Sequence, residues 1–200
     1  MGSTKYKVSE LKFTREAWLD NAVGLLSPIF NNKGYMVPKV KVSCGFASTG
    51  LRSRAIGQCW SSKSSEDGVN QIFISPELSD PIEVLDTLTH ELVHAVDDCE
   101  HRHGPEFKSI ALGVGLEGKM RQASAGADLL SKLKEVSKQL GDYPHAKLNV
   151  PIKFYNMSQR PKAKCSICGY TATPIKKFRS FGPPICPQHQ IVMDAIGEWT

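Results

Sequence analysis

Residues 90 to 103 contain four of the chain's six histidines within fourteen positions. His90 and His94 are four residues apart, so on a helix they lie one turn apart on nearly the same face. Both imidazoles can then reach one zinc ion at a Zn–N distance of about 2.0 to 2.1 Å. Glu91 follows the first histidine and completes the pattern H-E-x-x-H. In such sites the metal acidifies a water molecule, the glutamate takes its proton, and the water attacks a polarised carbonyl.

A catalytic zinc needs a third protein ligand and an open position for water. The pattern H-E-x-x-H-x-x-G-x-x-H is not met, because Asp97 stands at its glycine position and Glu100 at its last histidine position. His103 directly precedes Gly104-Pro105, which permits a sharp return of the chain and starts a helix. Histidines are the better zinc ligands, so His103 is favoured among four candidates, namely His101, His103, Glu106 and Glu117.

A second group of ligand types lies near the C-terminus. Two C-x-x-[C/H] knuckles with seventeen residues between them supply four ligands, namely Cys165, Cys168, Cys186 and His189. This spacing is typical of a zinc ribbon, whose closed ligand set makes the second zinc structural. A redox C-x-x-C is the alternative, but no βαβ pattern surrounds it. The scattered Cys44, Cys59 and Cys99 are expected to be small apolar core residues.

Length and charge bound the remaining possibilities. Two hundred residues suffice for one domain with a small appendage. With no run of eighteen apolar residues and no secretion signal at the N-terminus, we expect a cytosolic protein without a membrane partner. The whole net charge of +5 falls in residues 151–200, which hold seven of the 25 basic and two of the 20 acidic residues. This asymmetry favours a neutral body with a basic tail that contacts a polyanion.

The periodicity of apolar residues predicts the elements that position these groups. A helix is expected over 14–30, with Pro28 stopping or bending it near its end. Three alternating segments, 38–46, 55–60 and 69–75, predict an antiparallel meander whose last strand forms the sheet edge beside the cleft.

The metal-binding helix should begin after Asp80, an N-cap residue followed by Pro81. Its apolar stripe leaves His90 and His94 on another face. Two more helices are expected, one starting at Pro105 and one over 124–140. The apolar stripe consists of Ile82, Leu85, Leu88, Leu92, Val93 and Val96.

The segments HELVHAV (90–96) and HGPEF (103–107) resemble the active-site signature of the SprT-like (Spartan-like) zinc metalloproteases. The resemblance covers roughly residues 10–120 in element order and extends to the tail, because bacterial-type members carry a C-terminal zinc ribbon. It implies an α+β fold with a zincin-like domain over 8–145 and a basic zinc ribbon over 150–200. It also implies that His90, His94 and His103 bind the catalytic zinc and that Glu91 is the base. His189 departs from the family, whose usual fourth ribbon ligand is cysteine.

The resemblance further implies hydrolysis of peptide bonds in proteins on or near DNA. Basic residues in the tail alternate with aromatic ones, which suits single-stranded DNA. Tyr170 and Phe178 are nevertheless expected to form the core of the small module. Tyr143 and His145 are candidates for stabilising the oxyanion. The basic residues are Lys162, Lys164, Lys176, Lys177 and Arg179, and the other aromatic residues are Tyr155 and Phe181.

The alternative function is a zinc-containing nucleic-acid-binding or regulatory protein without proteolytic activity. Glu91 argues against this alternative, because a purely structural zinc has no need of an adjacent base.

Overall fold

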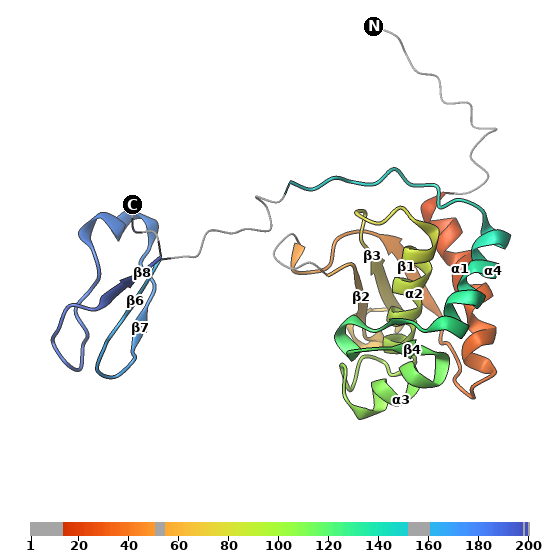
Figure 1. Cartoon of the computed structure of the whole chain (residues 1–200), viewed down its shortest axis with the longest axis horizontal. Coiled ribbons are helices and arrows are strands. Elements are labelled where there is room, and N and C mark those ends of the chain that lie inside the picture. Colours follow the sequence, from red (N-terminus) through yellow and green to blue (C-terminus); the bar gives the residue numbers. More distant parts are fainter. Residues whose placement is uncertain (1–13, 51–54, 152–160, 198, 200) are drawn as a thin grey trace, which may run out of the picture. The chain divides into compact units, whose positions relative to one another are not determined.

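The computed structural model describes residues 14–50, 55–151, 161–197 and 199. The chain divides into two compact units, Met1–Val150 and Pro151–Thr200. It is mixed α+β, as the sequence predicts (Figure 1). The predicted start of the first domain at residue 8 lies outside the described residues. None of the described helices is long and apolar enough to cross a membrane.

The first unit contains a three-stranded sheet of β1 (Val40–Cys44), β2 (Gly57–Trp60) and β3 (Asn70–Ile74). β3 lies in the middle, parallel to β1 and antiparallel to β2. The predicted antiparallel meander is therefore wrong. A meander joins neighbouring strands by short turns, whereas twelve residues, 45–56, separate β1 from β2. The expected edge strand at 72–75 is also wrong, because β2 is an edge strand and β3 is central.

Two helices pack on one face of this sheet, namely α1 (Arg15–Asn31) against β1 and α2 (Pro81–Val96) against β2 and β3. A third helix, α4 (Ala127–Leu140), packs on both of them (Figure 1). The core combines apolar residues from the sheet and the helices, and each fully buried Leu or Ile side chain contributes about 1.5 to 3 kcal/mol. It includes Trp18, Leu26, Val42, Ile72, Ile74, Leu88 and Leu133.

The helix ends follow local signals in the sequence. The Thr14 side chain accepts a hydrogen bond from the N–H of Ala17 at 3.1 Å. Asp80 accepts hydrogen bonds from the N–H groups of Ile82 and Glu83 at 2.9 and 3.0 Å. Both N-caps agree with the predicted starts of α1 and α2. Pro28 lies within α1, which continues to Asn31.

One predicted helix start is wrong. α4 begins at Ala127 instead of residue 124, because Ser124–Ala125 forms the short strand β5. β5 pairs antiparallel with β4 (Leu116–Glu117), which follows α3 (Pro105–Val114). A 3-10 turn, Met120–Gln122, lies between these two strands. This turn and β5 border the candidate site.

The second unit is a small antiparallel sheet with β6 (Lys162–Lys164) between β7 (Thr171–Ala172) and β8 (Asp194–Ile196). Its buried core consists of Ala163, Cys165, Cys186 and Met193. Tyr170 and Phe178 are 49% and 44% exposed, so the prediction that they form this core is wrong. The cysteines and small residues already fill the core of so small a unit. Tyr155 lies outside the described residues.

Two chain turns in this unit have the same backbone pattern. The N–H of Gly169 donates to the carbonyl of Cys165, and the N–H of Gln190 donates to that of Cys186, both at 2.9 Å. Gly169 and Gln190 both have a positive φ, 74° and 54°. Glycine adopts this conformation freely, whereas a residue with a side chain is strained. The second turn is therefore the more strained of the pair.

We predict that Gln190→Gly stabilises the second turn by about 0.5 to 1 kcal/mol, because glycine removes the left-handed strain. Gly169→Ala should destabilise the first turn by a similar amount. Amide hydrogen exchange of the zinc-loaded full chain measures both effects. Equal protection of residue 190 in the wild type and Gln190→Gly would contradict the assigned strain.

Candidate metal centre and its cavity

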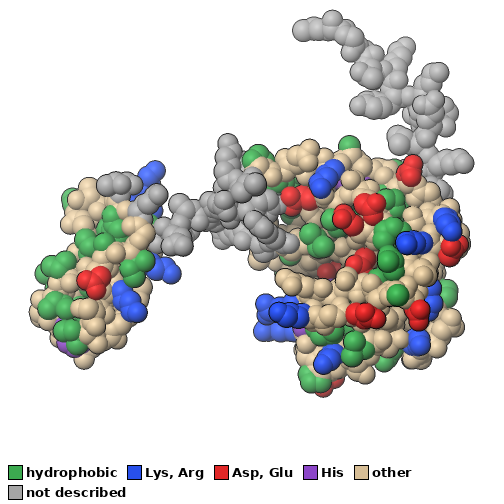
Figure 2. Space-filling model, viewed as in Figure 1, with side chains coloured by type: hydrophobic (Ala, Val, Ile, Leu, Met, Phe, Trp, Pro, Cys, Tyr) green, Lys and Arg blue, Asp and Glu red, His purple; other side chains and the backbone are tan. Residues whose placement is uncertain are grey.

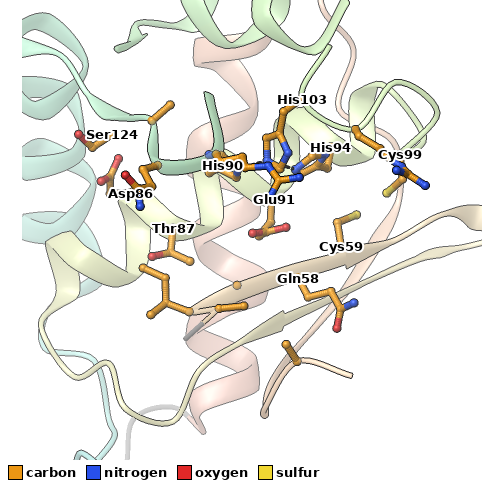
Figure 3. Close-up of a pocket in the computed structure, with 18 of the residues that line it drawn as sticks. Gln58, Cys59, Asp86, Thr87, His90, Glu91, His94, Cys99, His103 and Ser124 are labelled. Atoms are coloured by element: carbon orange, nitrogen blue, oxygen red, sulfur yellow. Dashed lines mark hydrogen bonds between the residues drawn. The ribbon is translucent and has the colours of Figure 1, made fainter. Parts of the chain in front are cut away.

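Three imidazole rings converge at the surface of α2 (Figure 3). The Nε2 atom of His103 lies 3.3 Å from that of His90 and 3.2 Å from that of His94. In α2 the predicted stripe residues Leu85, Leu88, Leu92 and Val93 are buried in the core, which leaves the two histidines of the helix to meet His103. His101 is exposed and is not part of this group.

The spacing of the three nitrogens fits one small metal ion. Ligands of a tetrahedral zinc at about 2.0 to 2.1 Å lie about 3.3 to 3.4 Å from one another. The observed separations of 3.2 and 3.3 Å match this value. Three protein ligands leave one tetrahedral position for a water molecule or a substrate atom.

His103 is positioned by the turn between α2 and α3. Asp97 accepts hydrogen bonds from the backbone N–H of His101 at 2.8 Å and from its ring Nδ1 at 2.7 Å. The N–H of Gly104 then donates to the His101 carbonyl at 2.8 Å. Asp98, Cys99 and Arg102 all have φ between 46° and 58°. A residue other than glycine is strained in the left-handed region, so the backbone of this turn stores strain. The strained turn places His103 beside the two histidines of α2.

One aromatic ring packs against all three imidazoles. The centroid of Phe107, the third residue of α3, lies 5.2 Å from that of His90, 4.3 Å from His94 and 4.9 Å from His103. Its side chain is fully buried. Packing against Phe107 therefore restricts the rotation of each candidate ligand.

A hydrogen bond to the segment before β5 orients His90. Its ring donates to the carbonyl of Ala123, which leaves Nε2 directed at the other two rings. Asp86, one helical turn earlier in α2, accepts from the N–H of Ala125 at 2.8 Å. These two bonds fix the β5 segment beside the histidines.

Burial keeps the imidazoles of α2 neutral. It lowers the pKa of His90 to about 4, with a further contribution from the charge of His103. Burial also lowers the pKa of His94 to about 3, with contributions from His90 and His103. The pKa of His103 is lowered by burial and by Arg121. Neutral imidazoles are the form that binds a metal ion.

Glu91 points from α2 toward β2 (Figure 3). Its side chain accepts a hydrogen bond from the backbone N–H of Cys59, yet burial raises its pKa to about 8. Such a carboxylate can exchange a proton near neutral pH. Gly57 makes the approach possible, because a Cβ there would lie 2.5 Å from Oε1 of Glu91 and 2.8 Å from Cγ2 of Thr87.

These groups line one cavity of about 770 Å³. β2 forms one wall, α2 the floor, and the segment from Arg121 to Ser124 another wall. Among the described residues, Arg102 and Arg121 are the cationic side chains of the lining. Tyr143 and His145 are not among the lining residues, so neither is placed to stabilise an oxyanion there.

The second predicted ligand group is also assembled. The Sγ atoms of Cys168 and Cys186 lie 3.8 Å apart, and Nδ1 of His189 lies 3.7 Å from Sγ of Cys165 and of Cys186. A tetrahedral zinc with Zn–S bonds of about 2.3 Å places its ligand atoms about 3.6 to 3.8 Å apart. Hydrogen bonds from the N–H groups of Cys168 and Ile167 lower the pKa of Cys165 to about 6, which favours the thiolate.

Several contributors to the site were not found from the sequence. The only sequence signal for Gly57 was that a glycine stands within a predicted strand. Such a glycine often marks a place where another segment approaches the backbone closely. Asp86 stands four residues before His90, the spacing of a neighbour on the same helix face.

Cys59 and Cys99 were expected in the core, but they are half-buried and line the cavity. Cys59 nevertheless packs against the hydrophobic core, so the core interpretation holds in part for this residue. It is wrong for Cys44 and Cys99, which are half-buried and do not belong to that core.

Comparisons with protein-family models, curated proteins and solved structures find no match to this chain.

We predict that Gly57→Ala destabilises the protein by about 1 to 3 kcal/mol, because the new methyl group collides with Glu91 and Thr87. Gly24→Ala is the matched control. Its Cβ would meet nothing within 4 Å in the middle of α1, so it should stabilise by up to about 1 kcal/mol. Urea denaturation of the full chain measures both changes. Equal effects of the two substitutions would contradict the close approach of β2 to α2.

Proposed function

We propose that the protein is a zinc-dependent metalloprotease of the SprT-like type, with a zincin-like first domain. The observation that carries the proposal is the convergence of three neutral imidazoles and one buried carboxylate in a single cavity. His90, His94 and His103 would hold the ion. Bound there, zinc would supply a Lewis acid that polarises a carbonyl and acidifies water.

Glu91 is proposed as the base. It would accept a proton from the attacking water and later donate it to the leaving amine. Its position supports this role, because Glu91 is only 6% exposed and directly follows His90, the first of the three histidines. Burial raises its pKa, so the carboxyl can hold a proton and release it.

β2 offers a docking strand for an extended peptide. The N–H of Ser75, the residue after β3, donates to the carbonyl of Ile56, so the main-chain groups of Ile56 face β3. The direction of these groups alternates along a strand, so those of the next residue and of every second residue after it face away from β3. Gly57 and Cys59 are two such residues; both line the cavity, and the N–H of Cys59 donates to Glu91. A peptide pairing with this edge would be bound by main-chain hydrogen bonds with little sequence preference.

We further propose that the second unit contacts DNA, with a preference for single strands, around a structural zinc. Lys176 and Lys177 are exposed, and Nζ of Lys177 lies 5.6 Å from the centroid of the Phe178 ring. Phe181 is 81% exposed, and its ring centroid lies 5.8 Å from that of Phe178. Figure 2 shows apolar side chains over much of one face of this unit. Exposed rings beside lysines suit stacked bases and phosphates.

The protease proposal predicts that Glu91→Gln lowers the rate of peptide-bond cleavage about 10²- to 10⁴-fold, because it removes the proton acceptor while preserving shape. The substrate is a DNA-bound protein, assayed with and without single-stranded DNA. Glu83→Gln, in the exposed first turn of the same helix, is the control and should cleave like the wild type. Equal cleavage by the wild type and Glu91→Gln, at equal zinc content, would contradict the mechanism.

The DNA proposal predicts that replacing Lys176 and Lys177 by glutamine weakens binding of single-stranded DNA. The dependence of log affinity on log salt concentration should become shallower by about 1.4, since each lost phosphate contact contributes about 0.7. Fluorescence anisotropy of a labelled oligonucleotide measures this. Lys132 and Lys134, exposed on α4, provide the matched double substitution. If both double variants bind alike, the second unit is not the DNA contact.

A further inference from the structure

Two thiols outside both metal groups meet in the cavity. Cys59 lies on β2, and Cys99 lies in the turn that follows α2. Both are half-buried and both line the cavity. Figure 3 shows the two side chains facing one another near Glu91, and the Cys99 side chain is the first cause of the raised pKa of Cys59. The Cys59 thiol donates a hydrogen bond to the carbonyl of Trp60 at 3.7 Å. Two reduced thiols that face one another in one cavity are candidates for a disulfide.

Hydrogen bonds hold the two backbones together. Asp98, next to Cys99, accepts from the N–H and the hydroxyl of Ser62 at 2.7 and 2.9 Å. It also accepts from the side-chain amide of Asn70 at 2.9 Å, which donates in turn to the carbonyl of Trp60 at 3.1 Å. The segment that follows Cys59 is thereby tied to the turn that contains Cys99.

The turn itself is fixed to the helix. The N–H of Cys99 donates to the carbonyl of His94 at 2.8 Å, which closes the end of α2. With both backbones anchored, the two side chains remain neighbours without rearrangement of the sheet. A disulfide requires Cα atoms about 4.4 to 6.8 Å apart, so preorganised backbones favour its formation.

We propose that Cys59 and Cys99 are a modification site, a dithiol that a peroxide oxidises to a reversible disulfide. One sulfur attacks the peroxide, so that an S–O bond forms while the O–O bond breaks. Hydroxide departs, and the attacking cysteine becomes a sulfenic acid. The second sulfur then attacks the first, the S–S bond forms, and the sulfenic oxygen leaves as water. Two thiols and one hydrogen peroxide thus give one disulfide and two waters, with two electrons passing from sulfur to peroxide.

The surroundings make this oxidation slow. The Cys99 thiol, burial, and the carboxylates of Glu91 and Asp98 together raise the pKa of Cys59. Little of this thiol is ionised at pH 7, and the thiolate is the species that reacts. Oxidation is therefore slower than that of an exposed thiol, and it accelerates as the pH rises.

The consequence for cleavage rests on the proposed function. A disulfide would tie the β2 edge to the end of α2 at Cys59, whose N–H contacts Glu91. A strand held in this way cannot adjust to an incoming peptide, so oxidation lowers the cleavage rate at least fivefold. Reduction with dithiothreitol restores it.

The test maps the disulfide directly in the zinc-loaded full chain. After treatment with hydrogen peroxide, free thiols are blocked with iodoacetamide and the protein is digested with trypsin. The expected product joins peptides 55–63 and 64–102, which contain Cys59 and Cys99 as their single cysteines. It forms in the wild type and in Cys44→Ser, whose thiol lies outside the cavity lining. It is absent from Cys59→Ser and Cys99→Ser, and from dithiothreitol-treated samples.

Recovery of both wild-type peptides as separately alkylated species after prolonged oxidation would overturn the proposal, whatever the variants do. For each protein, the cleavage rate after oxidation is divided by the rate before oxidation. Differences in basal rate between the variants therefore do not affect the comparison. A bridged wild type that cleaves at its reduced rate would overturn the regulatory consequence. If Glu91→Gln cleaves like the wild type while the bridged peptide forms, the protease proposal fails and the modification site stands.

Discussion

The convergence of three imidazole nitrogens on one point is the constraint on which the first unit depends. Two of the nitrogens come from one helix and the third from a strained turn, and they lie 3.2 and 3.3 Å apart. Such closeness is tolerable because burial keeps the rings of His90 and His94 neutral. The apolar stripe of α2, the Phe107 ring and the hydrogen bonds of Asp97 supply the frame that maintains it.

β2 connects this centre to the rest of the cavity. Gly57 allows the strand to approach α2 closely. The N–H of Cys59, the next inward-facing residue, donates to Glu91, and its side chain faces that of Cys99 (Figure 3). One short edge strand thereby contacts the proposed base, forms the proposed docking edge for a peptide and carries one of the two cavity thiols. The same features explain why changes to this strand should affect stability, chemistry and redox behaviour together.

Local rules predicted much of this architecture. The N-caps at Thr14 and Asp80 and the i, i+4 histidine pair depend on neighbours in sequence, and the structure agrees with them. The ribbon ligands follow equally local spacing. Strand order did not follow from local rules, because the parallel pairing of β1 with β3 is decided by packing against α1 and α2. The contacts of Gly57, Asp86 and the two cavity thiols were missed for the same reason, since each joins segments distant in sequence.

Anomalous diffraction at the zinc edge, from crystals of the full chain, tests the central claim most directly. The account predicts a peak about 2.0 to 2.1 Å from the Nε2 atoms of His90, His94 and His103, with no fourth protein ligand. A second peak should lie among Cys165, Cys168, Cys186 and His189. Absence of the first peak, or a protein side chain such as His101 in place of His103, would contradict the account.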